Sequence, residues 1–421
     1  GKRLAVTICE DIWNLGDNPL YRFCPMDKLI KQQPNIMINL SASPFDYLHE
    51  EDRKAVIRNN VFKYHLPMFY CNATGSQTEI VFDGASFVFD KDGNLRKALP
   101  QFKEALEAVV LNDDGTIDAP VVEPADKLLH KFPNKIELDP ERNIPQVHKA
   151  ILMGIKDYFK KMGFSKAVIG SSGGIDSAVT LAMACEALGS ENVRAILMPS
   201  PYSTKHSVND AVQLSKNLGN PYDTIRIDKI YESFLCTLKP AFKDLPFSIA
   251  EENIQSRTRG NLLMAIANKF GYILLNTSNK SELATGYGTL YGDMAGGLSV
   301  LGDCYKTQIY ALARYINRNR ELIPKNIITK APSAELRPDQ KDIDSLPEYD
   351  ILDKILFQYI ERRLGPGEIK AQCFDAPLVD KVLKLVNTNE YKRNQFCPVI
   401  RVSPKAFGVG RRVPIVGKYL S

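Results

Sequence analysis

The order of apolar and polar positions differs between the two ends of the chain. From residue 1 to residue 111, short apolar runs alternate with polar turns, and this pattern predicts strands at residues 4–8, 36–40, 68–72, 85–89 and 108–111. Between the second and third runs, Ala55, Val56, Val61 and Phe62 recur at helical spacing. Strands that alternate with a helix indicate a layered α/β fold for this first part.

The rest of the chain alternates more regularly. Apolar residues recur at helical spacing from residue 144 to 162, and Gly163 suits a C-terminal cap. The pattern predicts strands at 167–170, 193–198, 224–227 and 272–275, and helices at 176–188, 205–218, 249–270 and 351–364. Each strand is a nearly continuous apolar run, which is typical of parallel strands buried on both faces. Ligands of such sheets bind beyond the carboxyl ends of the strands.

These patterns predict an α/β protein with two domains. Residues 112–145 mix Asp, Glu, Pro and Lys with weak periodicity, as a connector on the surface does. We therefore place a first domain at residues 1–112, a linker at 113–143 and a second domain at 144–421.

Composition narrows the function classes. The chain has 421 residues and a net charge of +5, and its charges form no block of one sign, which does not favour nucleic-acid binding. No apolar run approaches the roughly 18 residues of a membrane span, so we expect a soluble protein without a membrane partner. The eight cysteines are scattered and form no CxxC pair, which argues against a zinc site and a disulfide framework. A reducing, cytoplasmic setting is the simplest interpretation.

A serine- and glycine-rich string joins the first strand of the second domain to its helix. It consists of Gly170, Ser171, Ser172, Gly173, Gly174, Ile175, Asp176 and Ser177. Small residues let a backbone approach an anion closely, and the N–H groups and dipole of a helix N-terminus attract phosphate. The string therefore predicts a phosphate-binding loop.

The same string lacks the GK[ST] ending of a Walker loop, so no lysine is placed for a transferring γ-phosphate. Asp176 would repel phosphates unless a cation bridged them, and Mg²⁺ is the expected cation. A glycine turn with Asp176 or Ser177 as an ordinary helix cap is the plainer alternative. The full string between this strand and this helix favours phosphate.

The string contains SGGxDS, and in this it resembles the signature of the ATP pyrophosphatase group, which splits ATP between its α and β phosphates. Four further strings strongly resemble the NAD synthetase family: ENIQ at 252–255, TSNKSE at 277–282, GYGTLYGD at 286–293 and DCYK at 303–306. The resemblance implies a Rossmann-like, adenine nucleotide alpha hydrolase-like domain. It also implies the reaction: ATP adenylates the carboxylate of deamido-NAD, and ammonia displaces AMP to give NAD.

The resemblance implies roles for individual residues. The residues that it implies as contacts to ATP are the string at 170–177, Thr277, Lys306 and Ser333. The implied Mg²⁺ ligands are Asp176 and Glu282. The implied contacts to deamido-NAD are Asn253, Arg257, Glu282, Tyr287, Gly288, Thr289, Leu290 and Lys392. Asn253, Arg257 and Asn261 also lie at i, i+4 and i+8 of a predicted helix. Such a polar stripe suits a dinucleotide site or a solvated helix face.

Residues 1–110 resemble the latter part of the nitrilase-like glutaminase domain of glutamine-dependent NAD synthetases. Cys9, in CEDIW, ends a predicted strand, where a strained turn can aim a thiolate at a carboxamide carbon. By the resemblance Cys9 is the glutaminase nucleophile and Ser43, in SASP, contacts glutamine; a small buried core cysteine is the alternative. The family's glutamate base and lysine lie upstream, and His49 stands where we expect Lys or Arg. We therefore expect a fragment of a longer protein, one that uses free ammonia.

Other functions stay open at this stage. An amidotransferase of the same group that forms GMP or asparagine would share the phosphate string, although the other four strings argue against it. A tRNA-thiolating enzyme would require a basic face and paired cysteines. A nucleotide-binding module would keep the site without turnover. The resemblance further implies a homo-oligomer built on synthetase-domain dimers.

Overall fold

The computed structural model describes residues 1–15, 21–125, 137–243, 245–338, 340, 342–344 and 346–417. It divides into two compact units, Gly1–Ile136 and Glu137–Ser421, which we describe one at a time. The predicted linker includes residues 126–136, which lie outside the described part of the chain. The domain boundaries at 112 and 143 stay predictions.

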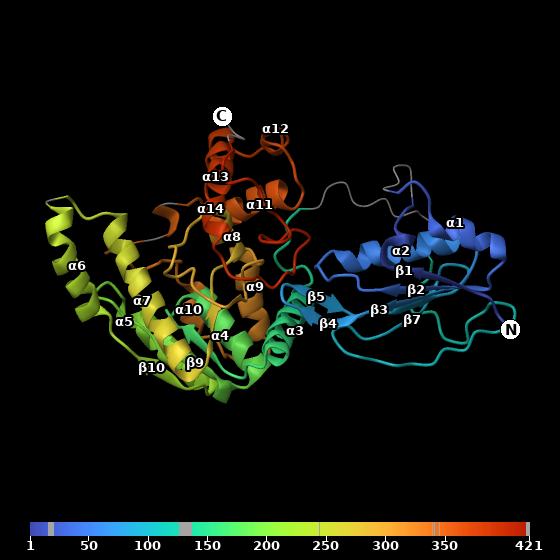
Figure 1. The fold of residues 1–421 in the computed structure, drawn as a ribbon, viewed down its shortest axis with the longest axis horizontal. Helices are drawn as coiled ribbons and strands as arrows, with labels where there is room; N and C mark the ends of the chain where they lie inside the picture. Colours follow the sequence, from blue (N-terminus) through green and yellow to red (C-terminus); the bar gives the residue numbers. More distant parts are fainter. Residues whose placement is uncertain are drawn as a thin grey trace. The chain divides into compact units, whose positions relative to one another are not determined.

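Unit 1 contains a five-stranded sheet in the order β1-β2-β3-β6-β7. Its strands are β1 (Leu4–Ile8), β2 (Ile36–Ser41), β3 (Met68–Asn72), β6 (Phe87–Phe89) and β7 (Leu95–Ala98). The first three are parallel, and the last two add antiparallel neighbours. A separate hairpin joins β4 (Thr74–Gln77) to β5 (Ile80–Asp83) (Figure 1). The predicted α/β layer is confirmed.

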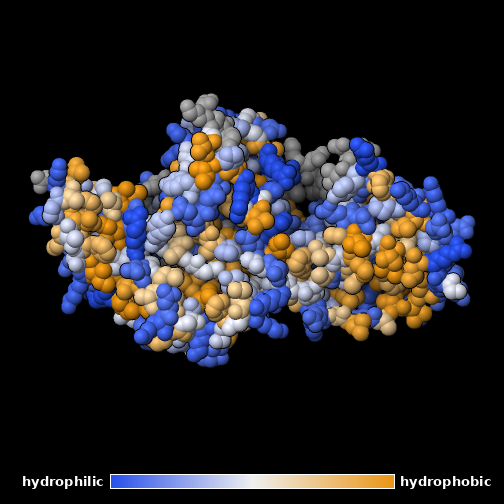
Figure 2. Space-filling model, in the orientation of Figure 1, coloured by the Kyte–Doolittle hydropathy of each residue, from blue (hydrophilic) through white to orange (hydrophobic). Residues whose placement is uncertain are grey.

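The helices of unit 1 cover one face of this sheet. They are η1 (Cys9–Ile12), α1 (Pro25–Leu29), η2 (Ile30–Gln32) and α2 (His49–Tyr64). Ile57 and Val61 of α2 pack with Met68 and Phe89 in the core between helix and sheet. On β1 the side chains of Leu4, Val6 and Ile8 alternate with buried positions and are exposed. Figure 2 shows apolar side chains gathered on the surface of this unit.

Unit 2 is built on an entirely parallel sheet in the order β10-β9-β8-β11-β12. The strands are β8 (Ala167–Gly170), β9 (Val193–Leu197), β10 (Tyr222–Thr224), β11 (Ile273–Asn276) and β12 (Leu298–Ser299). The first strand in sequence lies at the centre, and the order reverses between β8 and β11, as in Rossmann-like sheets. The predicted fold class is confirmed, and a ligand site is expected at this switch point.

Helices cover both faces of the sheet in unit 2 (Figure 1). On one face α4 (Ile175–Leu188) packs with α3 (Ile144–Met162), α5 (Lys205–Leu218) and α9 (Lys306–Ile316). Right-handed connections place α7 (Ile249–Phe270) on the other face, where it packs on β8 and β11. The remaining helices are η3 (Ser190–Asn192), α6 (Asp228–Phe242), α8 (Lys280–Thr285), α10 (Lys325–Thr329), η4 (Asp342–Asp344), α11 (Tyr349–Ile360), α12 (Pro366–Lys370), α13 (Ala376–Thr388) and α14 (Glu390–Arg393).

Two sequence predictions about elements are wrong, and one long helix was not predicted. Residues 108–111 form no strand: Leu111 makes one isolated bridge with Ile117, and Val110 is exposed, so the apolar run has no sheet to join. The strand predicted at 224–227 ends at Thr224, and the residues after it pack against α7 as a connector. Helix α6 was missed because it carries Pro240 and buries Tyr231 alone. Among the described residues no helix is long and apolar enough to cross a membrane.

Candidate active site

The serine- and glycine-rich string leaves the carboxyl end of β8 and opens helix α4. Hydrogen bonds within the string hold its shape. Ser172 Oγ lies 3.1 Å from Ser177 Oγ and accepts the N–H of Gly174 at 3.1 Å. Ser177 Oγ donates to Gly174 O at 3.0 Å. Ser171 Oγ is buried and has no hydrogen-bond partner among the described residues. A buried hydroxyl without a partner indicates a position that a ligand oxygen can fill.

Gly173 is required by the close approach of a second helix. Its φ is +78°, and an added Cβ would lie 2.1 Å from the backbone oxygen of Ser207, in the first turn of α5. A side chain at this position would force the two segments apart. The loop shape therefore depends on the glycine that the sequence pattern assigned to it.

Three charged side chains from three different elements meet beside the loop. Lys306 Nζ at the start of α9 donates to Asp176 Oδ2 at 2.5 Å and lies 3.7 Å from Glu282 Oε1 on α8. Asn279 Nδ2 donates to the other oxygen of Asp176 at 3.0 Å, and Asn279 also caps α8 by accepting the N–H of Glu282. We call Asp176, Glu282 and Lys306 the acid–lysine cluster.

Burial sets the protonation of this cluster. Burial, followed by the charge of Asp176, raises the pKa of Glu282 to about 8. For Lys306 burial alone would lower the pKa, but the charges of Asp176 and Glu282 outweigh it and raise the pKa well above its ordinary value. Lys306 is therefore a permanent cation, and Glu282 holds a proton that an arriving positive charge can displace.

A third carboxylate lies next to the cluster. Asp342 accepts the hydroxyl protons of Tyr287 at 3.3 Å and of Tyr349 at 3.0 Å. Burial raises the pKa of Asp342. The ammonium of Lys306 also lies 5.3 Å from the ring centre of Tyr349, within range of a cation–π contact. Acidic and aromatic groups thus surround this one lysine.

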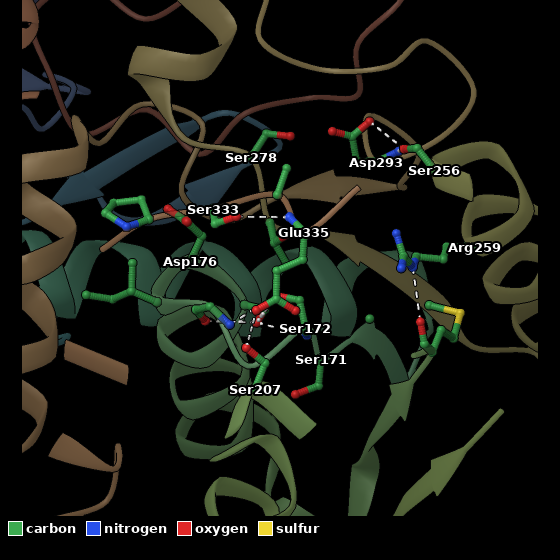
Figure 3. Close-up of a pocket in the computed structure, with 18 of the residues that line it drawn as sticks. Ser171, Ser172, Asp176, Ser207, Ser256, Arg259, Ser278, Asp293, Ser333 and Glu335 are labelled. Atoms are coloured by element: carbon green, nitrogen blue, oxygen red, sulfur yellow. Dashed lines mark hydrogen bonds between the residues drawn. The ribbon is translucent and has the colours of Figure 1, made fainter. Parts of the chain in front are cut away.

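These groups line one pocket with a volume of ≈ 300 Å³, all within unit 2. Its wall includes predicted ATP contacts from the loop as well as Thr277, Glu282, Tyr287, Lys306 and Ser333. Apolar side chains that include Met198, Val208 and Leu263 form another part of the wall. Figure 3 shows loop serines, Asp176, Arg259 and Asp293 arranged around this space. The pocket can therefore hold a flat apolar ring and a polyanion together.

The remaining residues predicted to contact deamido-NAD form a separate cluster that adjoins Tyr287. Thr289 Oγ1 donates to Asn253 Oδ1 at 2.7 Å, and Arg257 Nε donates to Leu290 O at 3.2 Å. Lys392 Nζ donates to the backbone oxygens of Gly286 and Gly288 at 2.7 and 2.8 Å. The structure brings these residues together, but outside the pocket wall; their roles stay predictions.

Ser333 lies on an exposed segment over the pocket. Its hydroxyl donates to Gln340 O and accepts the N–H of Glu335. The carboxylate of Glu335 accepts from Thr204 Oγ1 at 3.0 Å and from Ser207 Oγ at 2.6 Å, at the start of α5 (Figure 3). This segment is thus tied to the helix that packs on Gly173.

In unit 1 the predicted strained turn is present at Cys9. The residue follows β1 directly, and its φ is +48°, a left-handed conformation that is uncommon for any residue with a side chain. Four residues later, the ring of Trp13 stacks on His49 with a centroid distance of 5.1 Å. His49 Nε2 in turn lies 2.9 Å from Ser43 Oγ. A row of side-chain contacts therefore connects the segment that contains the predicted nucleophile to the predicted glutamine contact.

Comparison with known proteins decides the family. The model of the NAD synthase family matches residues 147–396. Glutamine-dependent NAD(+) synthetase from Synechocystis sp. is 45% identical over 417 residues, which cover 98% of this chain and 72% of that protein. The enzyme of the same name from Thermotoga maritima is 42% identical, with 99% and 75% covered.

The chain belongs to the glutamine-dependent NAD(+) synthetase family. A solved glutamine-dependent NAD+ synthetase from Acinetobacter baumannii, in complex with ADP, has 38% identity and a TM-score of 0.69 and covers 98% of this chain and 72% of its own. A second structure, from Cytophaga hutchinsonii, has a TM-score of 0.74 at 20% identity, covers 99% of this chain and 71% of its own, and shows the shared fold. The family membership expected from the sequence is confirmed.

Sequence reasoning about this NAD synthetase family member missed several groups in the pocket. Ser256, Arg259, Gly260 and Leu263 of α7 line it. Their spacing of i, i+3, i+4 and i+7 places them on one face of the helix. The sequence pattern could therefore have indicated this face as well as the polar stripe of Asn253, Arg257 and Asn261. Arg259 donates from Nε to Met198 O at 3.1 Å, and burial lowers its pKa. Asp342 has no comparable sequence signal.

Proposed function

We propose that this chain catalyses the ATP-dependent amidation of deamido-NAD to NAD through an NAD-adenylate, with release of AMP and pyrophosphate. The acid–lysine cluster at the mouth of a phosphate-type loop is the observation that carries the proposal. A Walker-type loop would carry its lysine within the loop, whereas here Lys306 comes from a separate helix and is paired with two carboxylates. Membership in the synthetase family supports the same reaction.

ATP would lie with its phosphates on the loop and its base in the apolar part of the pocket. Ser171 Oγ, which has no partner among the described residues, and the N–H groups at the start of α4 supply donors for phosphate oxygens. Met198 and Leu263 offer the apolar surface for the adenine ring. Thr277 and Ser333 would add hydroxyl donors from the opposite side of the loop.

The donor set fits Mg²⁺ bound together with ATP. The described residues contain no group of three side chains that would form a complete metal site. Mg²⁺ usually takes one or two carboxylates and completes its shell with water and substrate phosphates, and Asp176 with Glu282 matches this pattern. Lys306 already holds a positive charge between these carboxylates. Bound there, Mg²⁺ would neutralise charge on the phosphates.

In the first step a carboxylate oxygen of the nicotinate ring would attack the α-phosphorus of ATP. The bond from that phosphorus to the bridging oxygen breaks, and pyrophosphate leaves with the electron pair. The ammonium of Lys306 faces the loop and would stabilise the negative charge that builds on the leaving group, which is the main catalytic contribution expected at such a site. The loop N–H groups hold pyrophosphate in place.

In the second step ammonia would attack the acyl carbon of the NAD-adenylate. The bond to AMP breaks, the amide of NAD forms, and one proton leaves the nitrogen. Deamido-NAD would be oriented by Tyr287 and by the adjoining cluster of Asn253, Arg257, Gly288, Thr289, Leu290 and Lys392. Glu282 would lie at the meeting point of both substrates.

Ammonia would come from glutamine, through a thioester on Cys9. The positive φ of Cys9 supports a nucleophile held in a strained turn. Ser43 would bind glutamine, and His49 takes the place at which a permanent cation is expected. We further propose a cytoplasmic enzyme that forms homo-oligomers through synthetase-unit dimers.

The reaction is tested by product analysis. The protein is mixed with ATP, Mg²⁺, deamido-NAD and ammonium chloride, and we expect NAD, AMP and pyrophosphate in equal amounts. Asp176→Asn should lower the rate about 10³-fold, because it weakens the proposed site for Mg²⁺, which would neutralise charge on the phosphates; Glu232→Gln, at an exposed position on α6, should not. ADP as a product would contradict the proposal. Turnover of xanthosine monophosphate or aspartate would favour the other amidotransferases. Binding of ATP and deamido-NAD without release of pyrophosphate would favour a regulatory module.

A further inference from the structure

A buried carboxylate outside the pocket connects the helices that carry Glu282 and Lys306. Asp353 lies on α11 and is 0% exposed. Its Oδ1 accepts the hydroxyl proton of Ser281 at 2.5 Å. Its Oδ2 accepts both the backbone N–H and the hydroxyl proton of Thr307, each at 2.9 Å. One carboxylate thus binds the first turn of α8 and the first turn of α9.

Both partners of Asp353 stand next to residues of the acid–lysine cluster. Ser281 directly precedes Glu282, and Thr307 directly follows Lys306. The backbone N–H of Lys306 also donates to Ser281 Oγ at 3.0 Å, so a continuous chain runs from Lys306 through Ser281 to Asp353. A hydroxyl that accepts one hydrogen bond and donates another has its orientation fixed. The backbone beneath both cluster residues is therefore set by the same group.

A second set of polar contacts also holds α8 in place. Lys280 Nζ lies 3.0 Å from Asp303 and 2.7 Å from Glu361, and all three are buried. This second anchor joins α8 to the end of α11 without involving the cluster. A buried carboxylate has a cost, and burial raises the pKa of Asp353 to about 6, so it is ionised at neutral pH and can accept all three donors.

We propose that Asp353 is a positioning residue for the adenylation step: through Ser281 and Thr307 it fixes the distance at which Glu282 and Lys306 face Asp176 and the departing pyrophosphate. This inference rests on the proposed function. Displacements of about 1 Å in charged groups at a reaction centre cost about 100-fold in rate, so such a fixing contact matters to the chemistry. The second step, attack of ammonia on the adenylate, does not use the pyrophosphate contacts of Lys306, so it should depend less on Asp353.

The test compares the two half-reactions in one variant. Asp353→Asn keeps the shape of the side chain but replaces one carboxylate oxygen with an NH₂ group, which cannot accept the hydrogen bonds of Ser281 or Thr307. Adenylation is measured as exchange of labelled pyrophosphate into ATP that depends on deamido-NAD. Displacement is measured as NAD formation from prepared NAD-adenylate and ammonium. We expect exchange to fall about 10- to 100-fold and displacement to change less than about 2-fold.

Asp350→Asn is the matched control, because Asp350 is an exposed carboxylate on the same helix. It should change neither half-reaction. Equal losses in both half-reactions of Asp353→Asn would mean that the carboxylate serves only the fold, and unchanged exchange would also overturn the inference. If the wild-type protein shows no exchange at all, the proposed function itself fails, and the inference fails with it.

Ser281→Ala provides a second route in case Asp353→Asn does not fold. It removes the link to α8 and leaves both bonds from Thr307 to Asp353 intact. Exchange should again fall more than displacement. In the double variant the two losses should not multiply, because both changes break the same hydrogen-bond chain. Multiplicative losses would mean that Ser281 and Asp353 act separately, contrary to the proposal.

Discussion

Two strands of this protein end at candidate functional residues, and they differ in the number of strands with which they pair. β8, which ends at the phosphate loop, lies between β9 and β11 and is buried along its apolar length. β1, which ends at Cys9, pairs within the described part of the chain with β2 alone. Its pattern alternates buried and exposed positions, and Leu4, Val6 and Ile8 are on the exposed face.

This difference decides how much of a site each strand can support. The end of a central strand has a neighbour on each side, so the loop after β8 meets Met198 beyond β9 and Thr277 beyond β11. Within the described part of the chain, the segment after β1 has contacts that include the stacked rings of Trp13 and His49 and the hydroxyl of Ser43. The groups proposed for the synthetase chemistry all lie within unit 2, so mutation can separate their contributions.

The largest effect should come from the cation at the centre of the unit 2 site. Lys306→Met removes the positive charge beside the loop and leaves the charge of Asp176 without its partner, facing the phosphates. We expect ammonia-dependent NAD formation to fall about 10²- to 10³-fold in kcat. Lys354→Met, at an exposed position on α11, should retain the wild-type rate. Activity that survived Lys306→Met would show that the cluster is not the working part of this pocket.

Two glycines with the same backbone conformation test whether the loop shape depends on its neighbours. Gly173 has φ +78° and would place a Cβ 2.1 Å from Ser207 O, whereas Gly163 has φ +76° with nothing within 4 Å. Gly163→Ala should cost about 1–2 kcal/mol of unfolding free energy through its backbone alone. Gly173→Ala should cost about 2–4 kcal/mol, because a steric clash is added, and should raise KM for ATP. Equal costs in chemical denaturation would contradict the close approach of α5.

Three helices of unit 2 could be predicted from the sequence almost to the residue. The predicted limits 205–218 and 249–270 are those of α5 and α7, and Gly163 caps α3 with a positive φ as predicted. Each of them ends at a glycine with a positive φ, so the local chemistry and the tertiary structure agree on where the helix ends. Residues 170–177 could be predicted for a similar reason, because the whole loop is contiguous in the sequence.

The remainder of the site depends on contacts between distant segments. Asp342 and Asp353 reach the acid–lysine cluster from beyond residue 330, where no pattern in the sequence marks them. On α7 the polar stripe of Asn253, Arg257 and Asn261 suggested one face, while Ser256 and Arg259 on a neighbouring face line the pocket. Periodicity defines the faces of a helix but does not say which one meets a ligand.

The same substitution in the two strands gives a smaller and more direct test of their difference. Val168 in β8 is 0% exposed and Val6 in β1 is 49% exposed. Val→Thr keeps the side-chain shape and adds a hydroxyl, which at position 168 would be buried without a partner. We expect Val168→Thr to lower the unfolding free energy by about 1–3 kcal/mol and Val6→Thr to change it by less than about 0.5 kcal/mol. A large loss at Val6 would mean that β1 is not exposed as described.

The smallest expected effect concerns two buried carboxylates, one in each unit. Asp83 is paired with the guanidinium of Arg53 at 3.0 Å, whereas Asp353 has hydroxyl and N–H donors. Burial raises the pKa of Asp353 from 3.8 to about 6. Between these values the folded protein keeps a proton that the unfolded chain has lost, so stability falls as pH rises through this window.

Asp353→Asn lacks this proton and should not share that fall. The unfolding free energy of the variant, measured relative to wild type by chemical denaturation, should therefore increase by on the order of 1 kcal/mol from pH 4 to pH 6. Above about pH 7 the difference should stay constant, since the carboxylate is then ionised in both states. Asp350→Asn should follow the wild-type curve throughout. Parallel curves for Asp353→Asn and wild type would mean that Asp353 titrates like an exposed carboxylate, which its burial and its three donors do not allow.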